Sequence, residues 1–322
     1  MAKNIKQIIF EELLNKPIKK DNFYQFISGV IRGCGILTLS RKQFTLTLEH
    51  KSIELLQKIK EYVNEIYKYE VEEETEITNL NGNKKDKKYT LEFDRESSKN
   101  ILIRAEIFDK DFMFLEDFSK KFFKGSGSAR EYLSGLYLAC GNIRIPEKTS
   151  EKKTYGYTLS FNLNSQTAQD AIINLISKSV DIPVNKIFKR SDSSEIYIKD
   201  SECITNFFAY LECNNTMFTL LNFRLDMKIK NDANRAKNAD LANIDRQIDA
   251  SKKQIDAIKK LIETKQYEKL SDELKETCNI RINNPDLDLT QLGQMFNPPI
   301  SKSCINHRLR RLIELANKVE NK

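Results

Sequence analysis

Side chains that could bind nucleic acid are concentrated near the C-terminal end of the chain. Every charged residue between Pro299 and Leu312 is basic. Cations attract the phosphate backbone of nucleic acids, and polar side chains among them can form hydrogen bonds with base edges. The segment therefore favours contact with nucleic acid over an ordinary solvated helix face. The residues that we expect to make these contacts are Ser301, Lys302, Ser303, Asn306, His307, Arg308, Arg310 and Arg311.

Two short helices must position these side chains. The segment 287–296 has the apolar spacing of a helix, and Pro298 and Pro299 end it because proline cannot continue the hydrogen-bond ladder. Ser301 is a good N-cap for a second helix. The apolar face of that second helix would consist of Ile305, Leu309, Leu312, Ile313 and Ala316. Its opposite face would consist of Ser303, Cys304, His307 and Arg311.

This arrangement is that of a recognition helix, which packs on its predecessor and enters the major groove. Residues near the N-terminus of such a helix lie deepest in the groove, so we expect Ser303 and His307 to contact base edges. We expect Arg308 and Arg310 mainly to neutralise phosphate.

A polar segment with helical character, residues 223–265, precedes this pair of helices. Its apolar residues recur at alternating spacings of three and four, which is typical of a helix with one apolar stripe. We expect the stripe to pack against its own chain, and a short coiled coil is the alternative. The stripe consists of Leu241, Ile244, Ile248, Ile255, Ile258 and Ile262. The same segment carries candidates for hydrogen bonds to backbone or phosphate, namely Asn234, Arg235, Asn238 and Asn243.

The first two thirds of the chain contain an internal repeat. Residues 27–35 (ISGVIRGCG) are similar to residues 133–141 (LSGLYLACG), at an offset of 106 residues. Both segments keep a small residue at the second position and glycine at the third and ninth positions. Small residues at this spacing let two helices approach each other backbone to backbone, and the last glycine suits a helix end.

Similar patterns of strands and helices follow each copy of the repeat. Alternating apolar and polar residues predict strands, and apolar residues at helical spacing predict helices. Each half reads helix, hairpin, helix, hairpin, helix, so we predict an α+β fold in which this doubled domain precedes an all-α helix-turn-helix domain. The predicted strands are 36–40, 44–50, 71–78, 89–93, 142–145, 155–163, 186–190 and 195–199. The predicted domains are 1–120 and 121–222 for the two halves, 223–265 for a helical linker and 266–322 for the helix-turn-helix.

One hairpin of the first half is unusually charged. Residues 70–76 are acidic, Asn81-Gly82 favours a tight turn, and basic residues follow the turn. Opposite charges that face each other across two strands are ordinary, so we favour cross-strand pairing over a ligand site. The basic residues are Lys84, Lys85, Lys87 and Lys88.

The doubled segment resembles the LAGLIDADG motif of homing endonucleases. That resemblance implies two helices packed at a pseudo-twofold interface and two saddle-shaped sheets that lie over DNA. It also implies a catalytic acid at the eighth position of each motif, and Cys34 and Cys140 occupy those positions here. A neutral thiol is a poor ligand for Mg²⁺, and two-metal cleavage of a phosphodiester requires carboxylates.

We therefore predict a domain that has lost catalysis: no enzyme activity, no metal site and no cofactor. Free cysteine is often simply buried, so we expect Cys34 and Cys140 to be small buried side chains at the helix contact. A reversible disulfide between them is the alternative.

The C-terminal third resembles the WhiA family of bacterial proteins. Residues 234–243 (NRAKNADLAN) match the family pattern N-R-x-x-N-x-D-x-A-N, and residues 299–310 (PISKSCINHRLR) resemble its P-I-S-K-S-G-V-N-H-R-L-R stretch. Cys304 departs from that stretch, which has glycine there. The resemblance implies a transcription regulator, linked to sporulation in some bacteria and to cell division in others. Its implied partner is double-stranded DNA, and other transcription or division proteins are further candidate partners.

Composition sets the remaining expectations. The six cysteines occur singly, and two histidines are too few for an ordinary structural zinc site. No apolar run reaches membrane-span length, and the N-terminal segment lacks the apolar block of a signal peptide. We expect reduced thiols, no membrane partner, and a cytoplasmic, nucleoid-associated protein; the sequence carries no signal for an oligomeric state. Two other functions stay open: a scaffold whose endonuclease-like domain binds a partner protein, and a residual endonuclease or RNA maturase.

Overall fold

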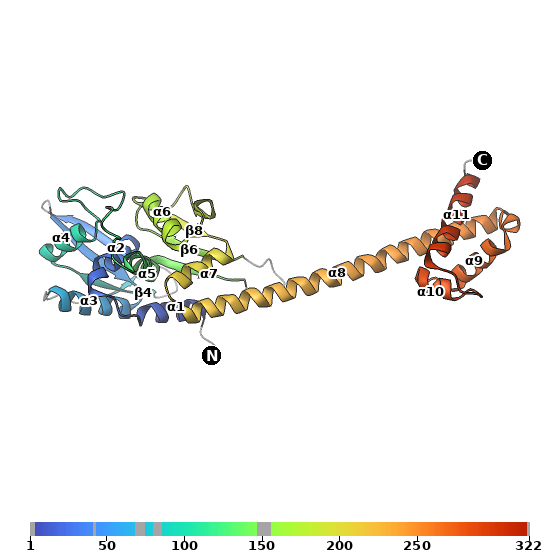
Figure 1. Ribbon diagram of the computed structural model, residues 1–322. Helices are drawn as coiled ribbons and strands as arrows, with labels where there is room; N and C mark the ends of the chain where they lie inside the picture. Colours follow the sequence, from blue (N-terminus) through green and yellow to red (C-terminus); the bar gives the residue numbers. More distant parts are fainter. Residues whose placement is uncertain (1–3, 41–42, 68–74, 80–85, 147–155, 321–322) are drawn as a thin grey trace. The chain divides into compact units, whose positions relative to one another are not determined.

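The computed structural model describes residues 4–40, 43–67, 75–79, 86–146 and 156–320. Within them, helices and strands alternate as far as Tyr210 and only helices follow (Figure 1). The chain divides into two units, Met1–Leu225 and Asp226–Lys322. Helix α8 (Asn214–Glu263) begins in the first unit and ends in the second. Among the described helices, none is both long enough and apolar enough to cross a membrane.

Both halves of the first unit contain the predicted order of helix, hairpin, helix, hairpin, helix, and the predicted α+β class is confirmed. The helices are α1 (Ile5–Leu14), α2 (Phe23–Cys34), α3 (Ile53–Tyr67), α4 (Arg95–Arg104), α5 (Ser128–Cys140), α6 (Gln169–Val180) and α7 (Ser201–Tyr210). The strands are β1 (Gly35–Ser40), β2 (Gln43–His50), β3 (Thr75–Asn79), β4 (Asp86–Glu92), β5 (Gly141–Arg144), β6 (Thr158–Asn162), β7 (Ile187–Lys189) and β8 (Glu195–Ile198). Helix α1 precedes the repeat and was not predicted.

Each half forms one antiparallel four-stranded sheet, and the two sheets have the same topology. Their strand orders are β1-β2-β4-β3 and β5-β6-β8-β7. On one face of each sheet, apolar residues that face each other across neighbouring strands are fully buried, such as Leu48 opposite Leu91 and Phe161 opposite Ile196. The repeat in the sequence is therefore a repeat of a whole helix-and-sheet unit.

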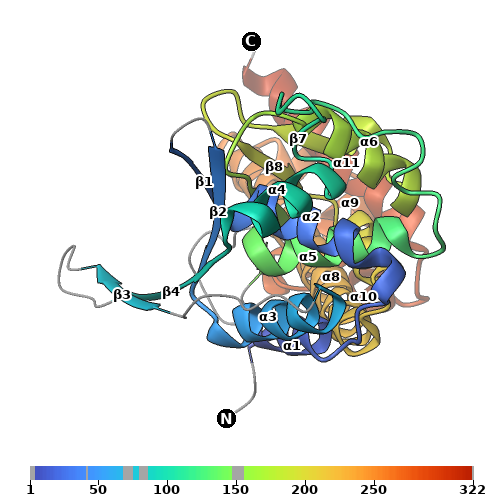
Figure 2. The same cartoon turned by 90° about the vertical axis from the view of Figure 1, so that its left-hand side faces the viewer.

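Helices α2 and α5 lie side by side where the two halves meet (Figure 2). A Cβ atom on Gly29 would lie 2.1 Å from the carbonyl oxygen of Tyr132, and one on Gly135 would lie 2.2 Å from the carbonyl oxygen of Phe26. No real Cβ contact is that short, so only glycine allows the two backbones to come this close. The predicted backbone-to-backbone approach is confirmed.

The first turn of α8 is fixed to the first unit by Glu12 of α1. The Glu12 carboxylate accepts hydrogen bonds from the backbone N–H groups of Asn215 (2.9 Å) and Thr216 (3.0 Å). These donors have no partner within the helix, so a carboxylate from a neighbouring helix caps them. Leu220, one turn further along, is buried in the core of the first unit.

The second unit has its own core, which α8 shares with three shorter helices. Those helices are α9 (Asp272–Asn283), α10 (Leu289–Gln294) and α11 (Lys302–Glu320). The buried residues of this core are Ala257, Ile258, Leu261, Cys278, Leu292, Phe296, Ile305, Leu309, Leu312 and Ala316. The first three of these residues come from α8. The division that we predicted between residues 265 and 266 therefore cuts through a packed core.

The apolar stripe predicted on α8 is buried only in part. Ile258 is fully buried, but Leu241, Ile244 and Ile248 are 49%, 50% and 58% exposed. Our prediction that the whole stripe packs against its own chain is therefore wrong. The buried residues of α8 beyond residue 250 centre on a neighbouring face of the helix; they are Ser251, Gln254, Ala257, Ile258 and Leu261. Ser251 on that face donates a hydrogen bond to the Pro285 carbonyl oxygen (2.7 Å).

The charged hairpin of the first half is described only in part. Strand β3 pairs with β4 as predicted, and Lys88 of β4 forms an ion pair with Glu49 of β2. This cross-strand pair uses an acid outside the acidic run that we had singled out. Residues 70–74, the Asn81-Gly82 turn, and Lys84 and Lys85 lie outside the described residues.

Candidate nucleic-acid interface

A tight turn joins α10 to α11. Asp288 caps α10 by accepting hydrogen bonds from the backbone N–H groups of Thr290 and Gln291. A Cβ atom on Gly293 would lie 2.4 Å from the carbonyl oxygen of Ile300, so glycine lets the turn fold back onto α10. The helix-turn-helix predicted from this segment is present. The first helix, predicted over 287–296, is observed as α10 (Leu289–Gln294), and the second is α11 (Lys302–Glu320).

Helix α11 begins after Ser301, as predicted. The Ser301 hydroxyl accepts a hydrogen bond from the Cys304 N–H (3.3 Å), which is the expected N-cap contact. Ile305, Leu309 and Leu312 are buried against α9 and α10. The apolar face predicted for this helix is therefore the face that anchors it.

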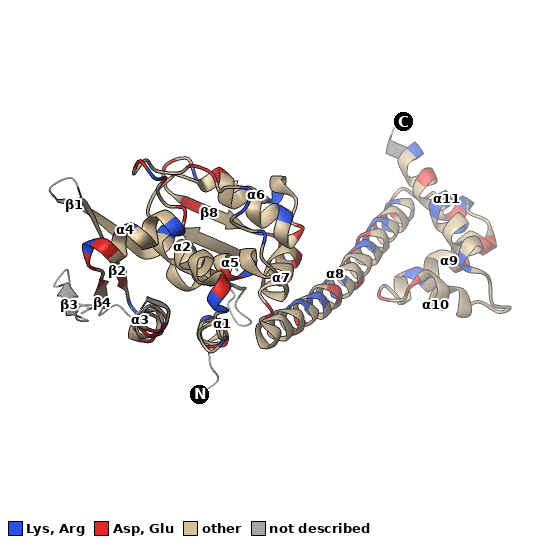
Figure 3. Ribbon diagram, turned by 60° about the vertical axis from the view of Figure 1, so that its left-hand side comes forward, with Lys and Arg blue, Asp and Glu red and all other residues tan. Residues whose placement is uncertain are grey.

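The outward face of α11 carries most of the side chains that we expect to contact nucleic acid. Ser303, His307 and Arg310 are exposed, and so is Arg311, which lies 3.4 Å from Glu314. Figure 3 marks the basic residues of this helix. Because Ser303, His307, Arg310 and Arg311 are exposed, a ligand can reach their polar ends.

Arg308 differs from its neighbours. Its side chain is only 15% exposed, forms an ion pair with Glu273 of α9 (3.1 Å), and lies over the Phe296 ring at 5.5 Å. The guanidinium therefore ties α11 to α9 and to the end of α10. These contacts favour a structural role for Arg308, because the backbone of α11 turns this position toward the neighbouring helices. That Arg308 neutralises phosphate stays a prediction.

The polar residues predicted on the linker lie on two sides of α8. Asn234 and Asn238 are about one turn apart. Asn243 lies nine positions beyond Asn234, which at 100° per residue is two and a half turns, so it lies on the opposite side of the helix. Asn234, Asn238 and Arg235 are exposed, and Arg235 lies 3.8 Å from Asp232. Only Asn243 is brought together with residues of α11.

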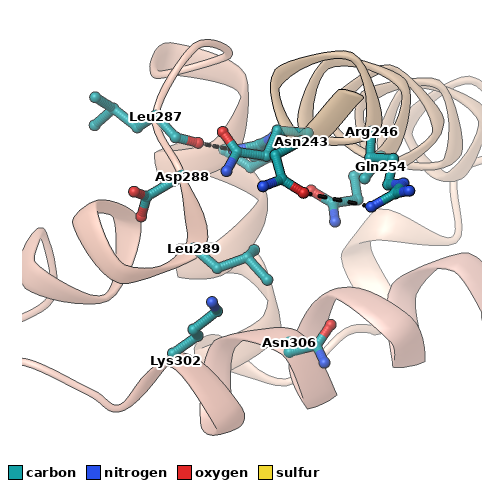
Figure 4. Close-up of a pocket in the computed structure, with 11 residues that line it drawn as sticks. Asn243, Arg246, Gln254, Leu287, Asp288, Leu289, Lys302 and Asn306 are labelled. Atoms are coloured by element: carbon teal, nitrogen blue, oxygen red, sulfur yellow. Dashed lines mark hydrogen bonds between the residues drawn. The ribbon is translucent and has the colours of Figure 1, made fainter. Parts of the chain in front are cut away.

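Asn243, Lys302 and Asn306 line a pocket of about 480 Å³ between α8 and the helix-turn-helix (Figure 4). The sequence reasoning missed the other polar residues of this pocket. They are Arg246, Gln247, Gln254, Arg281 and Asp288. Their positions depend on how α8 packs against α9 and α10, so spacing along the chain gave no signal for them.

Cys34 and Cys140 lie close together at the C-terminal ends of α2 and α5. A Cβ atom on Gly33 would lie 3.0 Å from the Cys140 sulfur, and both thiols are free. Burial, with a smaller contribution from Glu49, raises the pKa of Cys34 to about 12. Burial and the neighbouring Cys34 also raise the pKa of Cys140 well above its ordinary value. The raised pKa values disfavour the thiolate that disulfide exchange requires, so the environment of both thiols favours a packing role.

The open faces of the two sheets differ in charge. A cavity of about 530 Å³ on the second sheet is lined by Arg144, Arg190 and Lys199 and by one acid, Glu195, which forms an ion pair with Arg190 (3.1 Å). On the described part of the first sheet, the corresponding face carries Glu49 and Glu92 beside Lys88. The second sheet is therefore the more favourable of the two for a phosphate backbone.

Within the described residues, no group of three or more His, Cys, Asp or Glu side chains could hold a metal ion.

Comparison with known proteins identifies relatives over nearly the whole chain. Three family models match: the WhiA N-terminal LAGLIDADG-like domain over residues 23–108, the WhiA LAGLIDADG-like domain over 129–230, and the WhiA C-terminal HTH domain over 233–316. The "probable cell division protein WhiA" of Lysinibacillus sphaericus (strain C3-41) is 28% identical over 292 residues, which is 90% of this chain and 89% of that protein. The protein of the same name from Staphylococcus aureus (strain USA300) is 28% identical over 311 residues, 96% of this chain and 95% of that one.

Among solved structures, full-length DUF199/WhiA from "Thermatoga maritima" shares the fold. It is 22% identical, with a TM-score of 0.51, and the match covers 96% of each chain. The family model of the HTH domain begins at residue 233, inside α8, which agrees with the contribution of α8 to the second core.

Proposed function

The chain belongs to the WhiA family, and from that premise we propose that it is a non-catalytic, sequence-specific DNA-binding protein that regulates transcription in connection with cell division. The observation that carries the proposal is the outward face of α11. This face is polar and basic, and no acidic residue lies between Pro299 and Leu312. When it is bound to chromosomal DNA, such a protein is associated with the nucleoid.

The exposed residues of α11 have two different roles: some contact base edges and others contact phosphates. Ser303 and His307 are exposed in the first two turns, where a recognition helix lies deepest in the major groove. A neutral imidazole can both donate and accept a hydrogen bond, so His307 can distinguish bases. Arg310 and Arg311 lie further along the helix and supply charge toward the phosphates.

Mutation of His307 tests this division. His307→Ala should weaken binding to the preferred site by about 1–3 kcal/mol and have little effect on scrambled DNA. The preferred site comes from genome-wide mapping of bound DNA, and affinities for specific and scrambled duplexes are then measured over a range of salt concentrations. Equal weakening on both duplexes, together with a smaller salt slope, would mean that α11 docks on DNA differently. Absence of any wild-type affinity for DNA would refute the proposed function.

The non-catalytic character rests on Cys34 and Cys140, since neither supplies the carboxylate that phosphodiester cleavage by metal ions requires. Purified protein should leave its own bound DNA sites and plasmid DNA intact in the presence of Mg²⁺ or Mn²⁺. Metal-dependent cleavage that co-purifies with the protein, and that disappears in a Cys34→Ala/Cys140→Ala variant, would instead support a residual endonuclease.

A second candidate function is that of a scaffold whose first unit binds a partner protein while α11 binds DNA. The first sheet favours it: Glu49 is paired with Lys88, and Glu92 leaves the described part of this face with a net negative charge, which repels a phosphate backbone. DNA footprints of the full chain and of residues 226–322 separate the two candidates. Identical footprints support the scaffold, and a longer footprint for the full chain supports a DNA-contacting first unit.

A further inference from the structure

The pocket between α8 and the helix-turn-helix is unusually rich in cations. Arg246 of α8, Arg281 of α9 and Lys302 of α11 all line it, and Asp288 is the one acid among the lining residues. The Asp288 carboxylate already accepts two backbone N–H groups as the cap of α10. The lining residues therefore carry three positive charges against one negative charge, so the pocket has a net positive charge.

Two residues of the pocket wall also have buried polar atoms without a hydrogen-bond partner among the described residues. Arg281 is only 4% exposed, and its Nη1 donates to the Leu287 carbonyl oxygen (2.7 Å) (Figure 4). Within the described residues its Nε has no hydrogen-bond partner, and neither has the amide oxygen of Gln254, which is 7% exposed. A buried guanidinium N–H without an acceptor costs free energy unless a ligand supplies one. The Gln254 amide can turn over and present its two N–H donors instead.

The position of α11 adds to the attraction. The helix begins at Lys302, in the wall of the pocket, and Asn306 lines the pocket one turn later. The N-terminus of a helix of this length carries a partial positive charge that favours anions. We propose that this pocket binds a phosphate group, held by Arg246, Arg281 and Lys302.

Two sources could supply that phosphate. One is the DNA backbone beside the bases read by Ser303 and His307, in which case the inference rests on the proposed function. The other is a free, phosphorylated small molecule, since about 480 Å³ lies within the usual range of small-ligand pockets. In both cases Asn243 acquires a role, because it accepts a hydrogen bond from Arg246 (3.3 Å) and so helps to orient that guanidinium.

The decisive variant is Arg246→Gln, because Arg246 lines the pocket from α8 and was not among the residues expected on the recognition helix. Lys302→Gln is the second variant. Lys252→Gln is the matched control: it removes one positive charge from an exposed position of the same helix, outside the pocket. The full chain is used throughout, and circular dichroism verifies that each variant folds.

Two measurements distinguish the sources. If DNA supplies the phosphate, Arg246→Gln and Lys302→Gln each reduce the slope of log affinity against log salt for a short duplex by about 0.9, and Lys252→Gln does not. If a free ligand supplies it, calorimetry with pyrophosphate detects binding to the wild type and to Lys252→Gln. The other two variants then bind pyrophosphate at least about tenfold more weakly and keep the wild-type salt slope.

The inference is overturned if neither pocket variant changes the salt slope more than Lys252→Gln does and pyrophosphate does not bind. That result leaves the proposed function intact, provided that the wild type binds DNA. A wild type that fails to bind DNA would refute the proposed function. Pyrophosphate calorimetry alone would then test whether the pocket binds a phosphate group.

Discussion

Three arginines lie within one turn of α11 and have different surroundings. Arg308 is enclosed by Glu273 and Phe296, Arg310 is exposed, and Arg311 is exposed beside Glu314. An exposed arginine can exchange its hydration for a phosphate contact, whereas an enclosed one would first have to leave its partners. Residue type alone therefore does not identify a DNA contact, and the surroundings of each side chain decide its role.

Alanine substitutions should separate these roles. Arg308→Ala should lower the stability of the second unit by about 1–2 kcal/mol, because it removes an ion pair, a cation–π contact and the packing of the side-chain stem. The slope of log DNA affinity against log salt should stay unchanged. Arg310→Ala should leave stability unchanged and reduce that slope by about 0.9. Urea unfolding and salt titrations of both variants provide the measurements; a reduced slope in Arg308→Ala would support Arg308 as a phosphate contact.

The raised thiol pKa values have a consequence for reactivity. At pH 8 the Cys34 thiol, whose pKa is about 12, is almost entirely protonated, and thiolate is the reactive form. Iodoacetamide should therefore label the partly exposed Cys304 first and should reach the buried Cys34 only when the protein unfolds. Cys140 is also partly exposed, but its raised pKa should make it react more slowly than Cys304. Mass spectrometry of labelled peptides measures this order, and Cys304→Ser should remove the early label. Rapid formation of a Cys34–Cys140 disulfide under oxidised glutathione would instead support a redox pair.

At the scale of elements, the contact between α2 and α5 depends on two glycines that face the partner helix. Each lies against backbone atoms, which cannot move aside as the end of a flexible side chain can. The contact joins the two halves of the first unit, so its geometry sets how the two sheets are placed relative to each other. A change at this contact should therefore affect the first unit as a whole.

Gly135→Ala tests this dependence. Its Cβ would lie 2.2 Å from the Phe26 carbonyl oxygen, so the two helices must separate. We expect the free energy of unfolding to fall by about 1–3 kcal/mol. Gly156→Ala is the control, because a Cβ there would meet no atom within 4 Å. Thermal unfolding of both variants supplies the comparison. Equal stability of the two would show that the helices tolerate a wider spacing than we infer.

At the scale of the whole molecule, α8 belongs to both units. Glu12 of the first unit caps its N-terminus, and Ala257, Ile258 and Leu261 near its other end are buried in the second core. The structural division at residues 225 and 226 therefore assigns most of α8 to the second unit. A helix-turn-helix without this part of α8 would leave the apolar faces of α9 and α11 partly uncovered.

Truncation should reveal this requirement. A fragment of residues 226–322 should unfold cooperatively and bind DNA weakly, whereas residues 271–322 should be largely unfolded, because they lack the three buried residues of α8. Circular dichroism during urea titration provides the measurement. A stably folded 271–322 fragment would show that the helix-turn-helix does not depend on α8.

The sequence by itself determined the order of the elements, the doubled domain and the recognition helix. These features depend on local rules: alternation for strands, helical spacing for Ile305, Leu309 and Leu312, and the helix-ending effect of two prolines. Gly29 and Gly135 could also be interpreted from the repeat, because glycine at the same place in two helices indicates close contact.

Only the tertiary structure decided which polar side chains remain available to a ligand. Arg308 carries the same charge in the sequence as Arg310, but the packing of α9 and α10 encloses it. Arg246 and Arg281 are distant from Lys302 along the chain, and the packing of α8 brings all three to one pocket. Spacing fixes the face of a single helix on which a side chain lies, but neighbouring helices determine what covers that face.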